Sequence, residues 1–251
     1  MPSMPSILMP LPSEGFEPTE VAVPWKILRK AGVEVVFATL DGKPAACDPL
    51  ALEGVVFGQI GARPNDVQTY HELAKDAAFR SPIRYDEINP DRFEGVHLPG
   101  GHAPGMKPYL ESTELQGKIV EFFSRDLLVS AICHGPVLLA RAIDPKTNLS
   151  VVHGKKLTGL TKKLERAAFW LTFWTLGRHF RTYPEYVQDE VKRAVGPNGL
   201  FETGPWGASY GEGYTVVDGN LMTARWPGDS DELGRSLVAA LEERVQGANA
   251  S

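Results

Sequence analysis

Short runs of apolar and β-branched residues alternate with amphipathic segments along this chain, and this alternation restricts the fold more than any other feature. The runs predict buried strands at residues 6–11, 33–40, 95–101, 127–133 and 154–160, and a hairpin within residues 215–225. The amphipathic segments predict helices at residues 19–30, 69–79, 112–126, 134–142 and 229–245. Strands that alternate with helices form a mostly parallel sheet with helices on both faces, so we predict an α/β fold.

One segment, residues 166–196, departs from this alternation. It contains a helix rich in tryptophan and phenylalanine, followed by a second predicted helix from Pro184. We interpret the segment as a helical insertion. It would form either a hairpin packed on the core, or a cap over a pocket or an oligomer contact, because aromatic residues are enriched in interface cores. No internal repeat or linker divides the chain, so residues 1–251 are predicted to form a single domain.

The composition argues against two classes of partner. The formal net charge is -5 and no tract is rich in lysine and arginine, which disfavours nucleic acid. The most apolar stretch, residues 167–177, is far shorter than the ~20 residues that span a bilayer. The first residues lack the basic region of a signal peptide. We therefore expect a cytoplasmic protein with no nucleic-acid and no membrane partner.

The chain has only two cysteines, Cys47 and Cys133. Two cysteines cannot form a disulfide framework, and in a reducing compartment both are expected to be thiols. Neither cysteine has a second ligand at the spacing of a zinc motif, so we predict no metal and no cofactor. Cys47 lies in a predicted loop and receives no role.

Cys133 stands where a predicted strand meets a predicted helix. His134 follows it directly, and Gly135 gives the tight turn room. Ligands of open α/β sheets bind beyond the carboxyl ends of the strands, and a helix N-terminus there favours a thiolate. A cysteine is more often simply buried in a core. The strand-to-helix context instead favours a nucleophile, in the arrangement called a nucleophile elbow.

The segment AICHGP at residues 131–136 resembles the nucleophile elbow of the ThiJ/PfpI superfamily, which consists of flavodoxin-like relatives of the class I glutamine amidotransferases. Three further segments resemble that family in the same order: TEVAVPWKILRKAGVEVVFATLDG (19–42), FEGVHLPGGHA (93–103) and GKKLTGLTKKLE (154–165). The resemblance covers most of the chain. It implies a flavodoxin-like fold and a nucleophilic cysteine.

The resemblance also implies roles for individual residues. Cys133 is the implied nucleophile, and Glu20 is the implied acid–base group beside its sulfur, with a pKa that burial would raise. The backbone N–H groups of the loop with Gly100 and Gly101, together with that of His134, are implied to form an oxyanion hole. Without the resemblance, Glu20 equally suits a solvated position in the first turn of a helix, and the glycine pair suits a simple turn.

His134 needs a third group to orient it. In the subgroup with glyoxalase III and related heat-shock chaperones, the histidine next to the cysteine pairs with an acid beyond the post-elbow strand. Glu165 matches that place, although a charge on the surface of a helix is the alternative. His102, directly after the glycine pair, is a further candidate for the border of a substrate pocket, although loop histidines are commonly solvated.

Within the superfamily, the residues favour glyoxalase III-like chemistry on a small molecule. Glutamine amidotransferases use a late His-x-Glu motif, whereas neither His153 nor His179 is followed by a glutamate at that spacing. The thiolate of Cys133 would attack an aldehyde such as methylglyoxal. Glu20 and His134 would then move a proton between two carbons, without glutathione, metal or nucleotide.

Other activities of the superfamily stay open. A hydrolase or peptidase that acts on amides would use the same cysteine, as would an isocyanide hydratase, and a homodimer is compatible with the resemblance. A non-catalytic stress chaperone or redox sensor is a further alternative, because an accessible thiolate of low pKa is readily oxidised. The glycine-rich loop at residues 204–213, with Trp206 and Tyr210, would line a pocket mouth, and its spacing fits no phosphate-binding motif.

Overall fold

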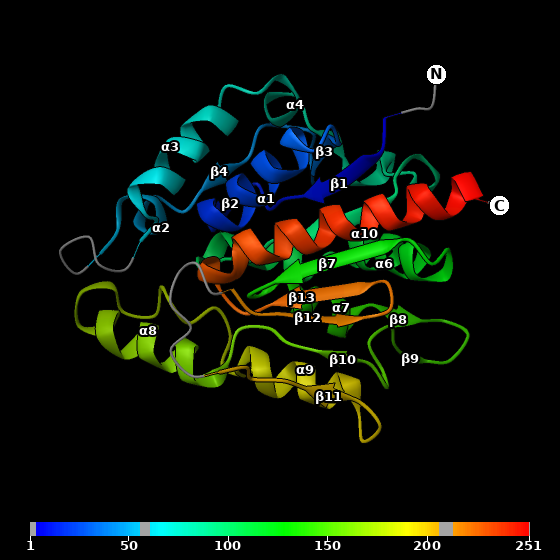
Figure 1. The fold of residues 1–251 in the computed structure, drawn as a ribbon. Helices are drawn as coiled ribbons and strands as arrows, with labels where there is room; N and C mark the ends of the chain where they lie inside the picture. The colour runs from blue at the N-terminus through cyan, green and yellow to red at the C-terminus, as the bar shows by residue number, and fades with distance from the viewer. Residues whose placement is uncertain (1–3, 56–60, 206–212, 251) are drawn as a thin grey trace.

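The computed structural model describes residues 4–55, 61–205 and 213–250, and it places a seven-stranded sheet at the centre of the molecule (Figure 1). The strand order is β12-β13-β7-β6-β1-β3-β5, and every neighbouring pair is parallel except β12 and β13. The strands are β1 (Ser6–Pro10), β3 (Glu34–Thr39), β5 (Ile83–Arg84), β6 (Gly95–Leu98), β7 (Leu128–Ile132), β12 (Thr215–Asp218) and β13 (Leu221–Ala224). The predicted α/β fold with a mostly parallel sheet is confirmed.

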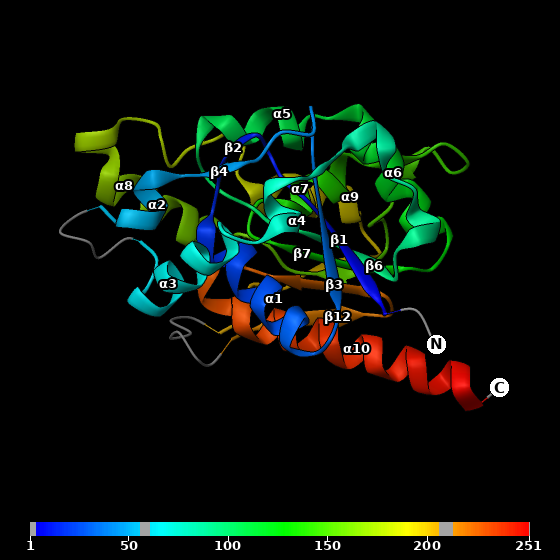
Figure 2. The ribbon, with the colours of Figure 1, turned by 90° about the horizontal axis from the view of Figure 1, so that it is seen from above.

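Helices cover both faces of this sheet (Figures 1 and 2). On one face, α1 (Pro18–Lys30) packs between α10 (Ser230–Ala250) and α3 (Pro64–Leu73). On the other face lie α6 (Thr113–Ser124) and α7 (Gly135–Arg141), which pack against β7. The central strands β1 and β7 are buried along their whole length, as strands covered on two sides must be.

Shorter elements connect these layers. The short helices are α2 (Pro49–Glu53), α4 (Ala77–Arg80) and α5 (Lys107–Leu110), with 3₁₀ turns at Tyr85–Glu87, Pro90–Arg92, Pro104–Met106 and Pro227–Asp229. Three two-stranded pairs lie outside the main sheet: β2 (Glu14–Phe16) with β4 (Ala46–Cys47), β8 (Ile143–Asp144) with β9 (Leu149–Ser150), and β10 (Lys156–Leu157) with β11 (Leu200–Phe201).

Local sequence signals fix the boundaries of α1, the helix that carries Glu20. The side chain of Glu17 caps its N-terminus by accepting a hydrogen bond from the Glu20 N–H, and Pro18 occupies the first turn. The helix ends before Gly32, whose φ of 76° suits a residue without a Cβ. The predicted stop at this glycine is confirmed.

Two predicted elements differ from the structure. The helix predicted at residues 69–79 is divided into α3 and α4, because the Asp76 carboxylate caps a new helix by accepting hydrogen bonds from the N–H groups of Ala78 and Phe79. The strand predicted at residues 154–160 is reduced to β10, which pairs with β11 and does not join the main sheet.

Residues 166–196 contain helical structure, as predicted. The segment includes most of α8 (Lys162–Leu176) and all of α9 (Val187–Val195). One side of α9 is buried against α7, whereas α8 leaves Trp170 and Trp174 exposed. Between the two helices runs a crossing segment, residues 177–186. Among the helices of the described ranges, none is both long and apolar enough to cross a membrane.

Candidate active site

The turn between β7 and α7 places Cys133 at the carboxyl edge of the sheet. Its backbone has a φ of 59°, a conformation that residues with a side chain seldom adopt and that clusters at functional sites. The turn is tight: a Cβ on Gly135 would lie 2.2 Å from the carbonyl oxygen of Leu98. The side chain of Cys133 is completely buried. The predicted elbow is therefore present, with its sulfur below the surface.

Glu20 lies against this sulfur from the first turn of α1. The N–H of Gly100 donates a hydrogen bond of 2.8 Å to Oε2 of Glu20, and the carboxyl interacts with Cys133. The other oxygen, Oε1, is buried and has no hydrogen-bond partner in the part of the chain that the structure describes. Burial and the neighbouring Glu17 raise the pKa of Glu20 well above its ordinary value. The group is therefore a neutral acid at neutral pH.

A second acid, Glu17, stands beside the first and was not singled out from the sequence. Its N–H donates to the carbonyl oxygen of Gly100 at 3.0 Å, while its carboxylate accepts from the Glu20 N–H at 2.8 Å. Burial raises its pKa to about 8. The order Glu-Pro-Thr-Glu, an acid before a proline at a helix start, is the signal that would have identified it as a cap.

A hydrogen-bond chain fixes the tautomer of His134. The hydroxyl of Thr182 donates to the carbonyl oxygen of His102 at 2.7 Å, so its single proton is used. Its oxygen lies 3.3 Å from Nε2 of His134 and must accept from an Nε2–H. Burial lowers the pKa of His134 well below its ordinary value, so the ring is neutral. Its unprotonated Nδ1 then faces the Cys133 Sγ at 3.5 Å.

Glu165 is not brought to His134. It is buried in the first turn of α8, where Arg181 donates to Oε1 and the N–H of Val187 donates to Oε2 at 3.1 Å. No hydrogen bond among the described ranges joins Glu165 to His134. Its hydrogen bonds instead connect α8 to the crossing segment and to the start of α9. The residue that contacts the His134 ring at Nε2 is Thr182.

The glycine pair contributes differently from the predicted oxyanion hole. The N–H of Gly100 is donated to Glu20, so it is not free to hold a substrate oxygen. Gly101 has a φ of 154°, and a Cβ there would lie 2.6 Å from the carbonyl oxygen of Gly15. The pair therefore positions Glu20 and allows close backbone packing, and only the N–H groups of Gly101 and His134 remain candidates for the oxyanion role.

His97 is a further residue of the site that sequence analysis did not assign. It is completely buried on β6, with Nδ1 2.9 Å from the Ser130 hydroxyl and Nε2 2.9 Å from the carbonyl oxygen of Glu20. A carbonyl can only accept, so Nε2 carries the proton. Burial lowers the pKa of His97 to about 4. The ring thus links the start of α1 to β6 and β7, and it holds Glu20 in place.

Four consecutive residues of the crossing segment make contacts in and around this site. Nε2 of His179 lies 2.7 Å from the Asp48 carboxylate, and the Phe180 ring packs on His102 with centroids 5.2 Å apart. Arg181 then pairs with Glu165, and Thr182 contacts His134. Sequence analysis did not assign these contacts, because irregular segments lack the periodicity that predicts neighbours.

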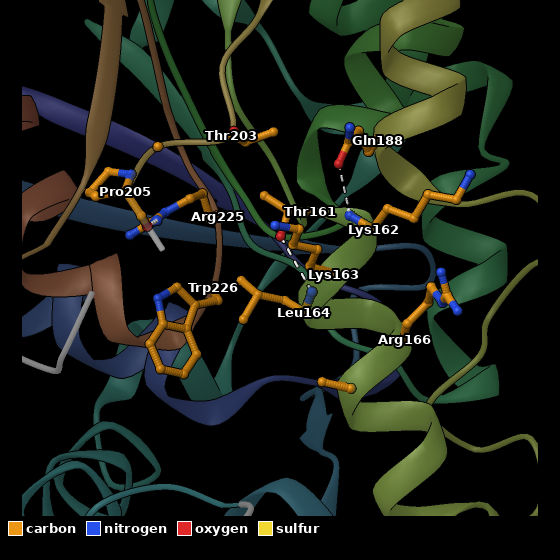
Figure 3. A pocket seen from close by; sticks show the side chains of 12 residues that line it. Thr161, Lys162, Lys163, Leu164, Arg166, Gln188, Thr203, Pro205, Arg225 and Trp226 are labelled. Atoms are coloured by element: carbon orange, nitrogen blue, oxygen red, sulfur yellow. Dashed lines mark hydrogen bonds between the residues drawn. The ribbon is translucent and has the colours of Figure 1, made fainter. Parts of the chain in front are cut away.

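A cavity of about 360 Å³ lies between His102 and α8. It reaches Glu17, His102 and Phe180, and α8 supplies one wall of it with small and aliphatic side chains: Leu164, Ala167, Ala168 and Leu171. A neighbouring pocket of about 560 Å³ shares Leu164, Ala167 and Trp226 with it. Figure 3 shows that pocket between Trp226 and Pro205 on one side and the start of α8 on the other.

The helical insertion therefore lines the cavity next to His102, while α9 packs on the core. From the glycine-rich loop predicted to line the pocket mouth, Pro205 and Gly204 line the larger pocket. Trp206 and Tyr210 lie outside the described residues.

The resting state of Cys133 differs from the expected thiolate. Burial, and then the neighbouring Glu20, raise the pKa of Cys133 well above its ordinary value, whereas the N–H of His134 has the opposite, smaller effect. The site thus holds a thiol between a neutral acid and a neutral base. Transfer of the thiol proton to Nδ1 of His134 would turn the sulfur into a nucleophile.

The raised pKa of Glu17 predicts how stability depends on pH. The folded protein keeps a proton that the unfolded chain releases above pH 4.5, so the free energy of unfolding falls as the pH rises from 4.5 toward 8. Glu17→Gln keeps the cap but cannot ionise. In urea unfolding, the variant is expected to match the wild type at pH 4.5 and to exceed it by about 3 kcal/mol at pH 7. A difference that does not change with pH would contradict this assignment.

Comparison with known proteins places this geometry in a family context. A family model described as ThiJ/PfpI family-like matches residues 11–197. Glyoxalase 3 of Candida albicans is 23% identical over 225 residues, which cover 89% of this chain and 88% of that protein. Glutathione-independent glyoxalase HSP31 of Saccharomyces cerevisiae is 25% identical over 225 residues, 89% of this chain and 87% of that protein. Deglycase PfpI of Pyrococcus furiosus is 25% identical over 236 residues, which cover 92% of this chain and 97% of that protein.

Solved structures agree on the fold. The crystal structure of glyoxalase III from Candida albicans superimposes with a TM-score of 0.68 at 19% identity and covers 94% of this chain and 97% of that one. The Rapid Encystment Protein of 24 kDa from Francisella tularensis gives a TM-score of 0.73 at 16% identity. The match covers 95% of this chain and 99% of that one. At these identities the likeness concerns the fold, and the chemistry has to be argued from the site.

Proposed function

The chain belongs to the ThiJ/PfpI family, and on this premise we propose that it is a cysteine-dependent enzyme for small reactive carbonyl compounds, converting methylglyoxal to lactate without glutathione. The observation that carries the proposal is the setting of Cys133, a buried thiol with an unprotonated Nδ1 of His134 at 3.5 Å and the Glu20 carboxyl against its sulfur. Relatives that span most of the chain and are named glutathione-independent glyoxalases support the substrate class.

The first step forms a bond between the Cys133 sulfur and the aldehyde carbon of methylglyoxal. Nδ1 of His134 takes the thiol proton as the sulfur attacks. The aldehyde oxygen takes up a proton from the neutral Glu20 carboxyl, whose Oε1 lacks another partner, and a hemithioacetal results. A buried site strengthens these transfers, because the fixed donors act in a medium of low dielectric constant.

The second step moves hydrogen from one carbon to the next without net oxidation. The ionised Glu20 removes the proton from the carbon bonded to sulfur, and the imidazolium of His134 protonates the neighbouring carbonyl oxygen, giving an enediol. Glu20 then returns its proton to the second carbon, and the hydroxyl on the first carbon loses its proton to Nδ1 of His134 as a thioester forms. Water cleaves the thioester: its hydroxyl group joins the acyl carbon, and its proton and the imidazolium proton of His134 restore the thiol of Cys133 and the Glu20 carboxyl. Overall, one methylglyoxal and one water give one lactic acid, which ionises to lactate.

The cavity fits this substrate class. Glu17 and His102 give its lining polar groups, and its α8 wall is apolar, so a short molecule with an apolar end and a carbonyl end matches both parts of the lining. The burial of Cys133 further favours small substrates, since the sulfur offers no exposed surface to a bulky one.

The test is product analysis with the purified protein, methylglyoxal and no thiol cofactor. We expect lactate, measured by proton NMR, in amounts equal to the methylglyoxal consumed. In D₂O the lactate methine keeps hydrogen if Glu20 passes the proton internally and takes deuterium if it exchanges with solvent. Consumption without lactate would overturn the proposal, because a thiol can also trap aldehydes without turnover.

A second candidate uses the same site. Three relatives from Pyrococcus and Thermococcus that match 92% of this chain are named deglycases, which favours release of a carbonyl adduct from an amine. Attack by the thiol of Cys133 on the adduct would lead through the same hemithioacetal. Incubation with an amine already modified by methylglyoxal, and measurement of the free amine, separates this activity from action on free aldehyde. The burial of Cys133 disfavours the redox-sensor alternative, which needs an accessible thiolate.

A further inference from the structure

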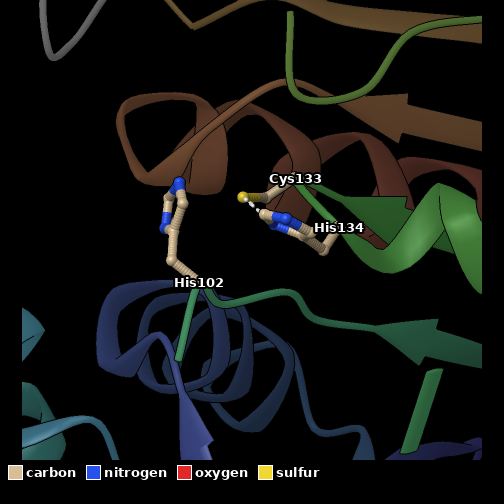
Figure 4. Close-up of side chains that lie close together, drawn as sticks. All are labelled: His102, Cys133 and His134. Atoms are coloured by element: carbon tan, nitrogen blue, oxygen red, sulfur yellow. Dashed lines mark hydrogen bonds between the residues drawn. The ribbon is translucent and has the colours of Figure 1, made fainter. Parts of the chain in front are cut away.

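We propose that His102, Cys133 and His134 form a binding site for Zn²⁺, in which the metal occupies the nucleophile and blocks it. Each residue offers one ligand atom, and these atoms all lie within 4.8 Å of one another. Figure 4 shows the His102 ring standing across from the Cys133 sulfur and the His134 ring. The inference goes beyond the proposed function, which requires no metal.

The spacing is close to that of a tetrahedral zinc ion. Zn–S bonds of ~2.3 Å and Zn–N bonds of ~2.0 Å place tetrahedral ligand atoms about 3.5 Å apart. The Cys133 Sγ and His134 Nδ1 already have this separation, 3.5 Å. Only the ligand atom of His102 has to approach the other two: it lies within 4.8 Å of them, against the tetrahedral spacing of about 3.5 Å.

His134 presents the required lone pair. Its Nε2–H is held by the Thr182 oxygen, so Nδ1 is unprotonated and faces the sulfur. Histidines that bind metals commonly donate the other ring N–H to such an outer partner, which fixes both the tautomer and the ring direction. Thr182 is itself anchored, because its hydroxyl donates to the carbonyl oxygen of His102. The outer contact therefore ties both histidines together before any metal binds.

His102 is free to move toward the metal. Its Nε2 is a buried nitrogen without a hydrogen-bond partner in the described ranges, an arrangement that normally costs stability and calls for a ligand. Its ring packs on His134 at 5.0 Å between centroids and on Phe180 at 5.2 Å. His102 also lines the cavity of about 360 Å³, which would supply the fourth, exchangeable ligand.

Binding of Zn²⁺ exchanges a proton for the metal and involves no oxidation or reduction. The Cys133 S–H bond breaks, a Zn–S bond forms, and the proton leaves to solvent. A thiolate bound to zinc cannot attack a carbonyl while the metal stays, so the metal inhibits any reaction that needs this sulfur. Two nitrogens and one sulfur suit zinc rather than magnesium or calcium, which prefer oxygen ligands.

The test is titration of the full-length, metal-stripped protein with Co²⁺, a spectroscopic substitute for zinc. We expect saturation at one equivalent, a sulfur-to-cobalt charge-transfer band in the near ultraviolet, and visible bands of tetrahedral intensity. One equivalent of Zn²⁺ should remove all of them. Cys133→Ser should abolish the charge-transfer band, and His102→Ala should weaken Zn²⁺ binding at least tenfold. Cys47→Ser, which changes the other thiol, should bind like the wild type.

The proposal is overturned if the wild type shows no charge-transfer band, if the band survives in Cys133→Ser, or if Cys47→Ser loses it. Unchanged affinity in His102→Ala would equally overturn the three-residue site. His102 and Cys133 are tested independently, so a folding defect in one variant leaves the other decisive. The spectra do not depend on turnover, so failure of the proposed glyoxalase activity would leave this result unaffected.

Discussion

Cys133→Ser is expected to convert methylglyoxal at a rate at least about a thousandfold below that of the wild type. Serine keeps the size of the side chain, the buried position and the backbone φ of 59° that the turn imposes. It loses the nucleophile, because the neutral Nδ1 of His134 at 3.5 Å is too weak a base to ionise a hydroxyl without the further machinery of a serine enzyme. The measurement is the steady-state rate of lactate formation at saturating substrate.

Cys47→Ser is the matched control for that variant. Cys47 is the other free thiol, and burial raises its pKa to about 11, so it is protonated at neutral pH. The control should keep the full rate. Loss of activity in Cys47→Ser, or more than a tenth of the wild-type rate in Cys133→Ser, would show that another residue carries the chemistry. Melting temperatures of both variants should stay within a few degrees of the wild type, since each change is nearly isosteric.

Gly135→Ala is expected to cost about 3 kcal/mol or more of folding free energy and to remove the activity with it. The added Cβ would lie 2.2 Å from the carbonyl oxygen of Leu98, which belongs to the backbone of β6 and cannot rotate away. The start of α7 must therefore move off the sheet. Because His134 directly precedes that start, its ring leaves the position from which it faces Cys133. A fall of the melting temperature by roughly 6–12 °C is expected for a chain of this size.

Gly117→Ala serves as the control for the same chemical change. Gly117 lies inside α6, where an added Cβ meets nothing within 4 Å. Alanine favours the helix over glycine by up to about 1 kcal/mol, so this variant should melt slightly higher than the wild type and keep its activity. If both glycine variants destabilise equally, the close approach of Gly135 to Leu98 is not what the turn depends on.

Much of the fold was predictable from the sequence, because it depends on patterns that repeat. Buried parallel strands are continuous apolar runs, and helices that cover a sheet have one apolar side. The order of strands and helices could therefore be predicted from the sequence. The hairpin within residues 215–225 was predictable for a similar reason, since Asp218 and Gly219 provide its turn. The strand expected at residues 154–160 was wrong because an apolar run says nothing about which partner strand is within reach.

The candidate site was predictable only where it depends on neighbours in the chain. Cys133 and His134 are adjacent, and the resemblance to a family supplied Glu20. The partner of His134 was not predictable, since Thr182 is 48 residues away in an irregular segment and reaches the ring through the fold alone. Glu165 failed as an orienting group for a related reason: Arg181, 16 residues later, takes its carboxylate.

The crossing segment has a consequence for how this protein could diversify. Phe180 and Thr182 contact the site histidines, and His179 and Arg181 pair with Asp48 and Glu165. The four residues are consecutive in the chain and belong to no strand of the central sheet. Exchange of one short stretch of coding sequence would therefore alter the orientation of the base, the packing on His102 and the anchoring of α8 together. The nucleophile and its scaffold would be inherited unchanged. One replaced segment would thus change the surroundings of His102 and His134 while leaving the central sheet as it is.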